Sequence, residues 1–198
     1  REKTGVAEIK MSNDANVAAL GEAKFGAGKE YGSSILITLG TGVGGGIIVD
    51  GKLLEGYKSA GAEVGHMVIC EGGALCTCGR HGCLEAYTSA SALIRLTKWK
   101  MQLDLTTKMW EIAGGKLENV DGKTAFLAAR AGDARGKEIV DEYVEHLAVG
   151  LANLANVLRP EAILLGGGVS NEGEYLFAPL RAAVEKEGFE VLSVENRR

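Results

Sequence analysis

The sequence contains little proline and no long apolar segment. Only 2 of the 198 residues are proline. No apolar run approaches the roughly 20 residues that a membrane-spanning helix needs, so the sequence does not predict an integral membrane protein. The formal net charge of −4 argues against a basic surface for nucleic acid or anionic lipid. The hydrophobic fraction of 46% is enough for the core of one or two globular domains.

Four cysteines are present, and three of them form a Cys-x-Cys-x₄-Cys array at Cys76, Cys78 and Cys83. His66 precedes the array, and thiolate and imidazole are the natural ligands of a closed structural zinc site. An even cysteine count in a secreted protein would suggest disulfides, but this spacing favours a metal. The array therefore predicts zinc and a reducing, cytoplasmic setting. Cys70 lies outside the spacing and is predicted to be a small packing residue.

The hydrophobic pattern predicts an α/β protein. A Gly-rich turn joins two apolar strands into a predicted hairpin, and a long amphipathic helix precedes a short buried strand. The predicted strands are residues 6–11, 35–39, 46–50, 52–54 and 162–165, and the predicted helices are residues 13–24, 89–100, 107–113, 123–131, 134–158 and one through 181–187.

Glycine is abundant, with 29 residues, and is concentrated where backbone would have to approach something closely. Between two predicted strands, glycines let backbone N–H groups converge on an anion because no Cβ blocks the approach. The P-loop pattern is absent, and a Gly-rich turn without a ligand is the alternative. A second glycine cluster follows a buried strand, where nucleotides often bind. The candidate residues are Gly40, Thr41, Gly42, Val43, Gly44, Gly45, Gly46, Gly166, Gly167 and Gly168.

Four further polar residues are candidates for a site. Asn13 and Asp14 could simply cap a helix, or Asp14 could act as a general base while Asn13 binds a neighbouring hydroxyl. Glu63 and Glu85 flank the predicted zinc array. They could be solvated surface charges, or carboxylates placed to bind a molecule rich in hydroxyl groups.

Taken together, these elements resemble the ROK family of bacterial sugar kinases and regulators, most closely its glucokinases. The matching segments are Asn13-Asp14-Ala15-Asn16, residues 39–47, Glu63-x-Gly65-His66, the array from Cys76 to Glu85, and Leu165-Gly166-Gly167-Gly168. The resemblance implies an α/β actin/hexokinase-like ATPase fold with a ribonuclease-H-like core, of which the chain would hold mainly the larger C-terminal lobe.

The resemblance also implies roles for the candidate residues. Asp14 would be the catalytic base, residues 40–46 the second phosphate loop, and residues 166–168 part of the adenosine site. The implied sugar contacts are Asn13, Glu63, His66 and Glu85, and the implied ligands of a structural Zn²⁺ are His66, Cys76, Cys78 and Cys83. ATP and Mg²⁺ would be required.

The implied function is ATP-dependent phosphorylation of a hexose, with glucose to glucose 6-phosphate favoured. A kinase for mannose, fructose or N-acetylmannosamine is one alternative. A sugar-responsive transcriptional repressor, with a helix-turn-helix upstream of residue 1, is another. The resemblance further implies a homodimer or homotetramer, with no membrane or nucleic-acid partner for the kinase.

One family motif has no counterpart in this sequence. The Asp-x-Gly-x-Thr hairpin that normally forms the first phosphate loop does not occur, nor does a closing helix after Glu195. We therefore expect a fragment, in which residues 1–30 are a remnant of the smaller N-terminal lobe and residues 31–198 form the larger C-terminal lobe.

Overall fold

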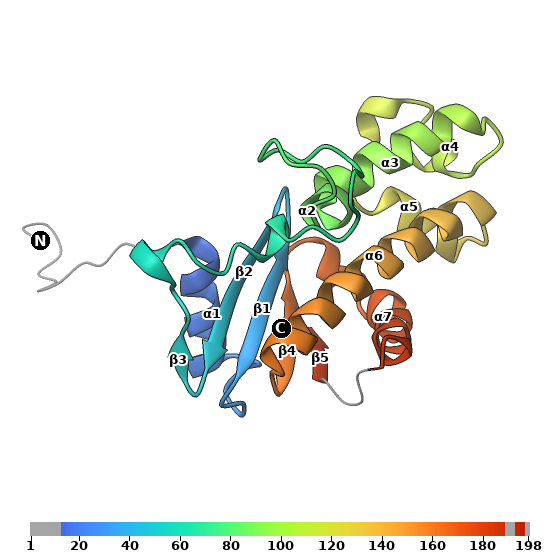
Figure 1. Ribbon diagram of the computed structural model, residues 1–198. Helices are drawn as coiled ribbons and strands as arrows, with labels where there is room; N and C mark the ends of the chain where they lie inside the picture. The colour runs from blue at the N-terminus through green and yellow to red at the C-terminus, as the bar shows by residue number, and fades with distance from the viewer. Residues whose placement is uncertain (1–12, 189–192, 197–198) are drawn as a thin grey trace, which may run out of the picture.

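The computed structural model describes residues 13–188 and 193–196 (Figure 1). Its sheet has five strands in the order β3-β2-β1-β4-β5. These are β1 (Ser34–Leu39), β2 (Val43–Val49), β3 (Lys52–Leu53), β4 (Ala162–Gly166) and β5 (Ser193–Asn196). β1 pairs antiparallel with β2 and parallel with β4, which confirms the predicted hairpin and α/β class. The strand predicted at residues 6–11 lies outside the described residues.

β1 is central because its side chains are apolar on both faces. Ile35 and Ile37 belong to the main core beneath the C-terminal helices, whereas Leu36 packs in a smaller cluster with Ala19 of α1 (Asp14–Phe25). This alternation is the period-2 pattern of a strand buried on both sides. The sheet is therefore covered by α1 on one face and by α6 and α7 on the other (Figure 1).

The helices agree with the predicted pattern, although their ends shift by a few residues. They are α2 (Glu85–Thr88), α3 (Ala90–Leu103), α4 (Met109–Ile112), α5 (Thr124–Arg130), α6 (Ala134–Leu158) and α7 (Glu174–Lys186). Short 3₁₀ turns occur at Tyr57–Ser59, Val64–His66, Leu117–Asn119 and Val169–Glu172. None of the helices in the described ranges is long and apolar enough to cross a bilayer.

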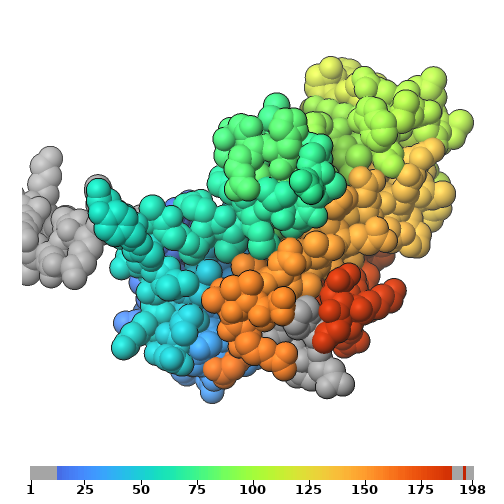
Figure 2. Space-filling view, viewed as in Figure 1, coloured from blue at the N-terminus to red at the C-terminus, as the bar shows by residue number. Residues whose placement is uncertain are grey.

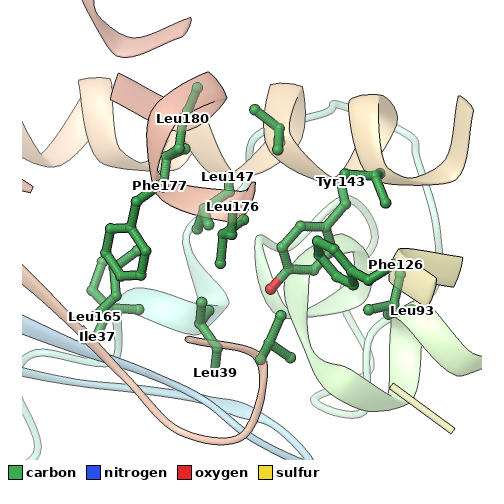
Figure 3. Close-up of a cluster of buried hydrophobic side chains, with 14 of the residues drawn as sticks. Ile37, Leu39, Leu93, Phe126, Tyr143, Leu147, Leu165, Leu176, Phe177 and Leu180 are labelled. Carbon is green, nitrogen blue, oxygen red and sulfur yellow. The ribbon is translucent and has the colours of Figure 1, made fainter. Parts of the chain in front are cut away.

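The main core lies where α6 crosses the sheet and the α3–α5 region (Figure 3). Tyr143 and Phe126 meet edge to face with ring centroids 6.3 Å apart. The Tyr143 hydroxyl is fully buried, and it donates a hydrogen bond of 2.8 Å to the Thr88 carbonyl. This bond fixes the end of α2 against the longest helix, so the core directly supports the segment that starts at Glu85.

Two predictions about local structure were wrong. β2 begins at Val43 rather than residue 46, so four of the residues assigned to a glycine loop are in a strand. Cys70 is exposed instead of packed, because it lies on the projecting segment that carries the cysteines (Figure 2). The helix predicted through residues 181–187 is confirmed as the C-terminal part of α7. β5 was not predicted at all.

Candidate functional site

A cavity of about 430 Å³ opens at the carboxyl end of β1, within the size range of small-molecule sites. Ligands of open α/β sheets commonly bind at the carboxyl ends of the strands. The cavity brings together every predicted sugar contact, the predicted base and most of the predicted phosphate-binding residues. Its lining residues are Asn13, Asp14, Thr38, Gly40, Thr41, Gly42, Val43, Gly44, Gly45, Ala62, Glu63, His66, Glu85 and Gly167.

Asn13 and Asp14 reach the cavity from the first turn of α1. The Asn13 side-chain oxygen accepts a hydrogen bond of 2.9 Å from the Ala15 N–H, and an Asp14 carboxylate oxygen accepts one of 2.8 Å from the same group. Both residues are exposed. Helix capping and a role in the cavity are therefore compatible, because the cap itself fixes the Asp14 carboxylate at the edge of the cavity.

The β1–β2 hairpin forms a second wall. Its turn is short, with the Gly40 N–H donating to the Gly42 carbonyl at 3.0 Å. Gly167 lies directly beside this turn, because a Cβ there would be 2.5 Å from the Leu39 carbonyl oxygen and its φ is +89°. Only glycine accepts that combination. The turn and the end of β4 thus form one continuous backbone surface without side chains.

Three of the predicted anion-binding residues do not line the cavity: Gly46, Gly166 and Gly168. Gly46 instead lies under α1, where a Cβ would be 2.4 Å from the Ala19 Cβ. Gly45 lies under Val64 in a similar way, with a Cβ 2.3 Å from a Val64 methyl group. The glycines of β2 therefore allow other segments to pack directly on the strand.

Glu63 directly precedes the 3₁₀ turn Val64–His66, which rests on β2, and His66 is the last residue of the turn. A Cβ at Gly65 would be 2.1 Å from the Val43 carbonyl oxygen, so the turn can lie this close only with glycine. The close packing directs Glu63 and His66 to the cavity from opposite ends of the turn. The spacing Glu-x-Gly-His therefore follows from the packing: the glycine lets the turn contact β2, and Glu63 and His66 on either side of it line the cavity.

His66, Cys76, Cys78 and Cys83 converge, with one possible ligand atom from each lying within 4.8 Å of the others. The Cys78 and Cys83 sulfurs are 3.7 Å apart, and the Cys76 sulfur is 3.6 Å from His66 Nδ1. A tetrahedral zinc ion with Zn–S bonds of about 2.3 Å places its sulfur ligands about 3.8 Å apart. The donor set and its spacing therefore fit a Cys₃His zinc site.

Two thiols of the cluster have pKa values that are shifted in opposite directions. Burial, with the neighbouring Cys78 and Cys76 sulfurs, raises the pKa of Cys83 to about 12. In contrast, the backbone N–H of Arg80 lowers the pKa of Cys78. A metal bound by the sulfur atoms would favour the thiolate form of its ligands.

Glu85 connects the cysteine loop to the hairpin. One of its carboxylate oxygens accepts a hydrogen bond of 2.6 Å from the Thr77 hydroxyl, and the other accepts one of 3.0 Å from the Val43 N–H. Burial raises the pKa of the carboxyl, but the bonds from Thr77 and Val43 outweigh this and hold the pKa below its usual value. Glu85 is therefore an ionised, oriented hydrogen-bond acceptor at the cavity.

The sequence pointed to these motifs but missed several residues around them. Thr38 and Ala62 line the cavity, and Thr77 holds Glu85. Thr38 could have been found as the last polar residue before the glycine turn. Thr77 carried no signal, because nothing in the sequence requires a particular residue between two predicted zinc ligands.

Comparison with known proteins identifies the family. The sequence model described as "ROK family" matches residues 2–196. The chain belongs to the ROK family. Among its ROK relatives, the glucokinase of Thermotoga maritima is 41% identical over 89% of this chain and 56% of its own length. A xylose repressor of Caldicellulosiruptor bescii is 31% identical over 91% of this chain and 45% of its own length.

Solved ROK structures share the fold. A crystal structure of a ROK glucokinase from Streptomyces griseus, in complex with glucose and AMPPNP, matches with a TM-score of 0.89 and 36% identity. The match covers 99% of this chain and 65% of that structure. The actin/hexokinase-like ATPase fold is thereby confirmed. The chain spans about half the length of the curated relatives it matches.

Proposed function

We propose that the protein phosphorylates a hexose at the expense of ATP, with glucose the favoured substrate. The observation that carries this proposal is the single cavity in which Asp14, Glu63, His66 and Glu85 face the glycine hairpin. The similarity to glucokinases, one of them crystallised with glucose and an ATP analogue, supports the same conclusion. Sugar hydroxyls would bind the carboxylates and the imidazole, and phosphates would lie along the hairpin.

In this proposal Asp14 accepts the proton of the attacking sugar hydroxyl, and Asn13 orients a neighbouring hydroxyl. Backbone N–H groups of the glycine turn stabilise charge on the phosphates. Mg²⁺, when bound with ATP, neutralises the charge that develops during transfer. Glu85 and His66 hold the ring of the sugar so that the reacting hydroxyl lies within reach of Asp14.

A structural zinc ion is the second part of the proposal. His66, Cys76, Cys78 and Cys83 would hold it, and four protein ligands leave no open coordination position. Because His66 Nδ1 faces Cys76, the other ring nitrogen stays free for a sugar hydroxyl. The zinc would thus tie the cysteine loop to the segment that carries His66, and would orient the imidazole.

The proposal includes two further predictions, on the lobes and on the oligomeric state. Residues 1–30 would belong to the smaller lobe of a ROK kinase and residues 31–198 to the larger one. The kinase would act as a homodimer or homotetramer.

The base assignment is tested with Asp14→Asn in the complete gene product. An asparagine oxygen can still accept the Ala15 N–H, so α1 keeps its cap. We expect kcat to fall roughly 10²–10⁴-fold, while glucose affinity by calorimetry changes only a few-fold. Asp141→Asn, an exposed carboxylate on α6, is the matched control and should retain activity. Activity of Asp14→Asn within a few-fold of the parent would exclude Asp14 as the base.

A sugar-responsive repressor is the second candidate, because the xylose repressor matches 91% of this chain. The retained Asp14 and glycine hairpin favour a kinase, since a sensor needs neither. A coupled assay of the complete gene product against a panel of hexoses distinguishes the two: a repressor would bind a sugar without turnover.

A further inference from the structure

Glu85 is restrained at both carboxylate oxygens by groups from two loops that are distant in sequence. Thr77, from the cysteine loop, donates its hydroxyl to Oε1 at 2.6 Å. Val43, at the start of β2, donates its N–H to Oε2 at 3.0 Å. Hydrogen bonds to an ionised group are the strong ones. Glu85 therefore acts as a bridge between the cysteine loop and the glycine hairpin.

The hairpin is shaped to receive this carboxylate. A Cβ at Gly42 would lie 2.6 Å from Glu85 Oε2, so a side chain at Gly42 would displace Glu85. The Cys76 sulfur also lies 3.6 Å from Oε1. These three contacts still leave part of the capacity of a carboxylate, which offers about four lone-pair positions. The remaining positions are available to hydroxyl groups of a ligand in the cavity that Glu85 lines.

We propose that Thr77 is a positioning residue for hexose binding, which acts by fixing the Glu85 carboxylate. This inference rests on the proposed function. Thr77 lies between two of the converging cysteines, so folding of that cluster sets the position of its hydroxyl. Through its bond with the Val43 N–H, Glu85 also connects the cysteine loop to the hairpin. A carboxylate fixed before the ligand arrives saves the cost of ordering it on binding.

The test compares Thr77→Val with Thr77→Ser in the complete gene product. Valine keeps the shape and removes the hydroxyl, whereas serine retains it. We expect Thr77→Val to weaken glucose binding by roughly tenfold and to raise KM more than it lowers kcat. Thr77→Ser should remain within about threefold of the parent. Bound metal and Tm should be unchanged in both variants.

Thr106→Val is the matched control. Its hydroxyl also donates to a carboxylate, that of Asp104 at 2.7 Å, but on an exposed loop that does not line the cavity. Glucose affinity should not change in this variant. Equal loss of affinity in Thr77→Val and Thr77→Ser would refute the role of the hydroxyl, as would unchanged affinity in a folded Thr77→Val that retains its metal.

A second measurement does not depend on the sugar. Hydrogen exchange of the Val43 N–H reports whether Glu85 still accepts its bond. Thr77→Val should exchange this proton several-fold faster, whereas Thr77→Ser and Thr106→Val should not. If the parent protein binds no hexose, the proposed function is wrong while this readout still decides the positioning role. Unchanged exchange in Thr77→Val would overturn the inference whatever the sugar result.

Discussion

Replacing Gly46 with alanine should destabilise the packing of α1 on β2. The new Cβ would lie 2.4 Å from the Ala19 Cβ and 2.8 Å from the Ala15 carbonyl oxygen. Neither neighbour can rotate away, because one is a helix backbone atom and the other is a Cβ. Overpacking of this kind costs about 1–3 kcal/mol, which corresponds to a decrease in Tm of roughly 2–12 °C for a domain of this size. Differential scanning calorimetry measures the change.

Gly21→Ala is the matched control, because Gly21 lies on the exposed face of the same helix. No heavy atom lies within 4 Å of a Cβ at that position. Alanine in a helix interior is more stable than glycine by about 1 kcal/mol, so the Tm of Gly21→Ala should rise. If Gly46→Ala were as stable as the parent, β2 would not be packed under α1 as described, and an anion-binding role for Gly46 would regain support.

Three further predictions concern the metal and the core. Metal analysis of the purified protein should find one zinc per chain, and Cys78→Ser should lose most of it with lower stability; a zinc content near zero in the parent would contradict the proposed site. Asp133→Ala should cost about 1–2 kcal/mol in urea unfolding because Asp133 caps α6. Burial raises the Asp133 pKa, but hydrogen bonds from Lys108, Gly136 and Thr107 outweigh it and depress the pKa. The carboxylate is thus stabilising above its unfolded pKa, and the difference between variant and parent should shrink as the pH falls below about 4. Tyr143→Phe should cost about 1–2 kcal/mol, because it leaves the Thr88 carbonyl without its buried donor; an unchanged urea midpoint would refute this.

Helices were predictable where local signals agreed. α6 begins and ends at the predicted residues because the apolar period and Arg159-Pro160 indicate the same helix, and the structure adds Asp133 as its N-cap. Arg159 adopts the left-handed conformation, with φ of 44°, directly before the proline that cannot continue a helix. α1 was predictable for a similar reason, since Asn13 caps it.

The start of β2 was predicted wrongly because the segments that pack on its glycines are distant in the sequence. A glycine that contacts phosphate and a glycine that another segment covers look alike in a sequence. Gly46 is covered by Ala19 and Ala15 of α1, and Gly45 is covered by Val64. Neither contact could be inferred from spacing. The glycine-rich segment between two apolar strands therefore predicted the hairpin, but it did not predict where the turn ends and β2 begins.

The same contrast applies to the site. The cysteine array could be read from the sequence because its ligands are close together, and local turns alone bring them into one cluster. Glu85 could be predicted as a site residue from the sequence. Its hydrogen bond with Val43 could not, because the two residues are 42 positions apart. The structure adds that the cysteine loop, Glu85 and the hairpin are one connected unit. A substitution at Thr77 or at Gly42 should therefore weaken sugar binding by displacing the same carboxylate. The loss of binding free energy in the double variant should then be smaller than the sum of the two separate losses.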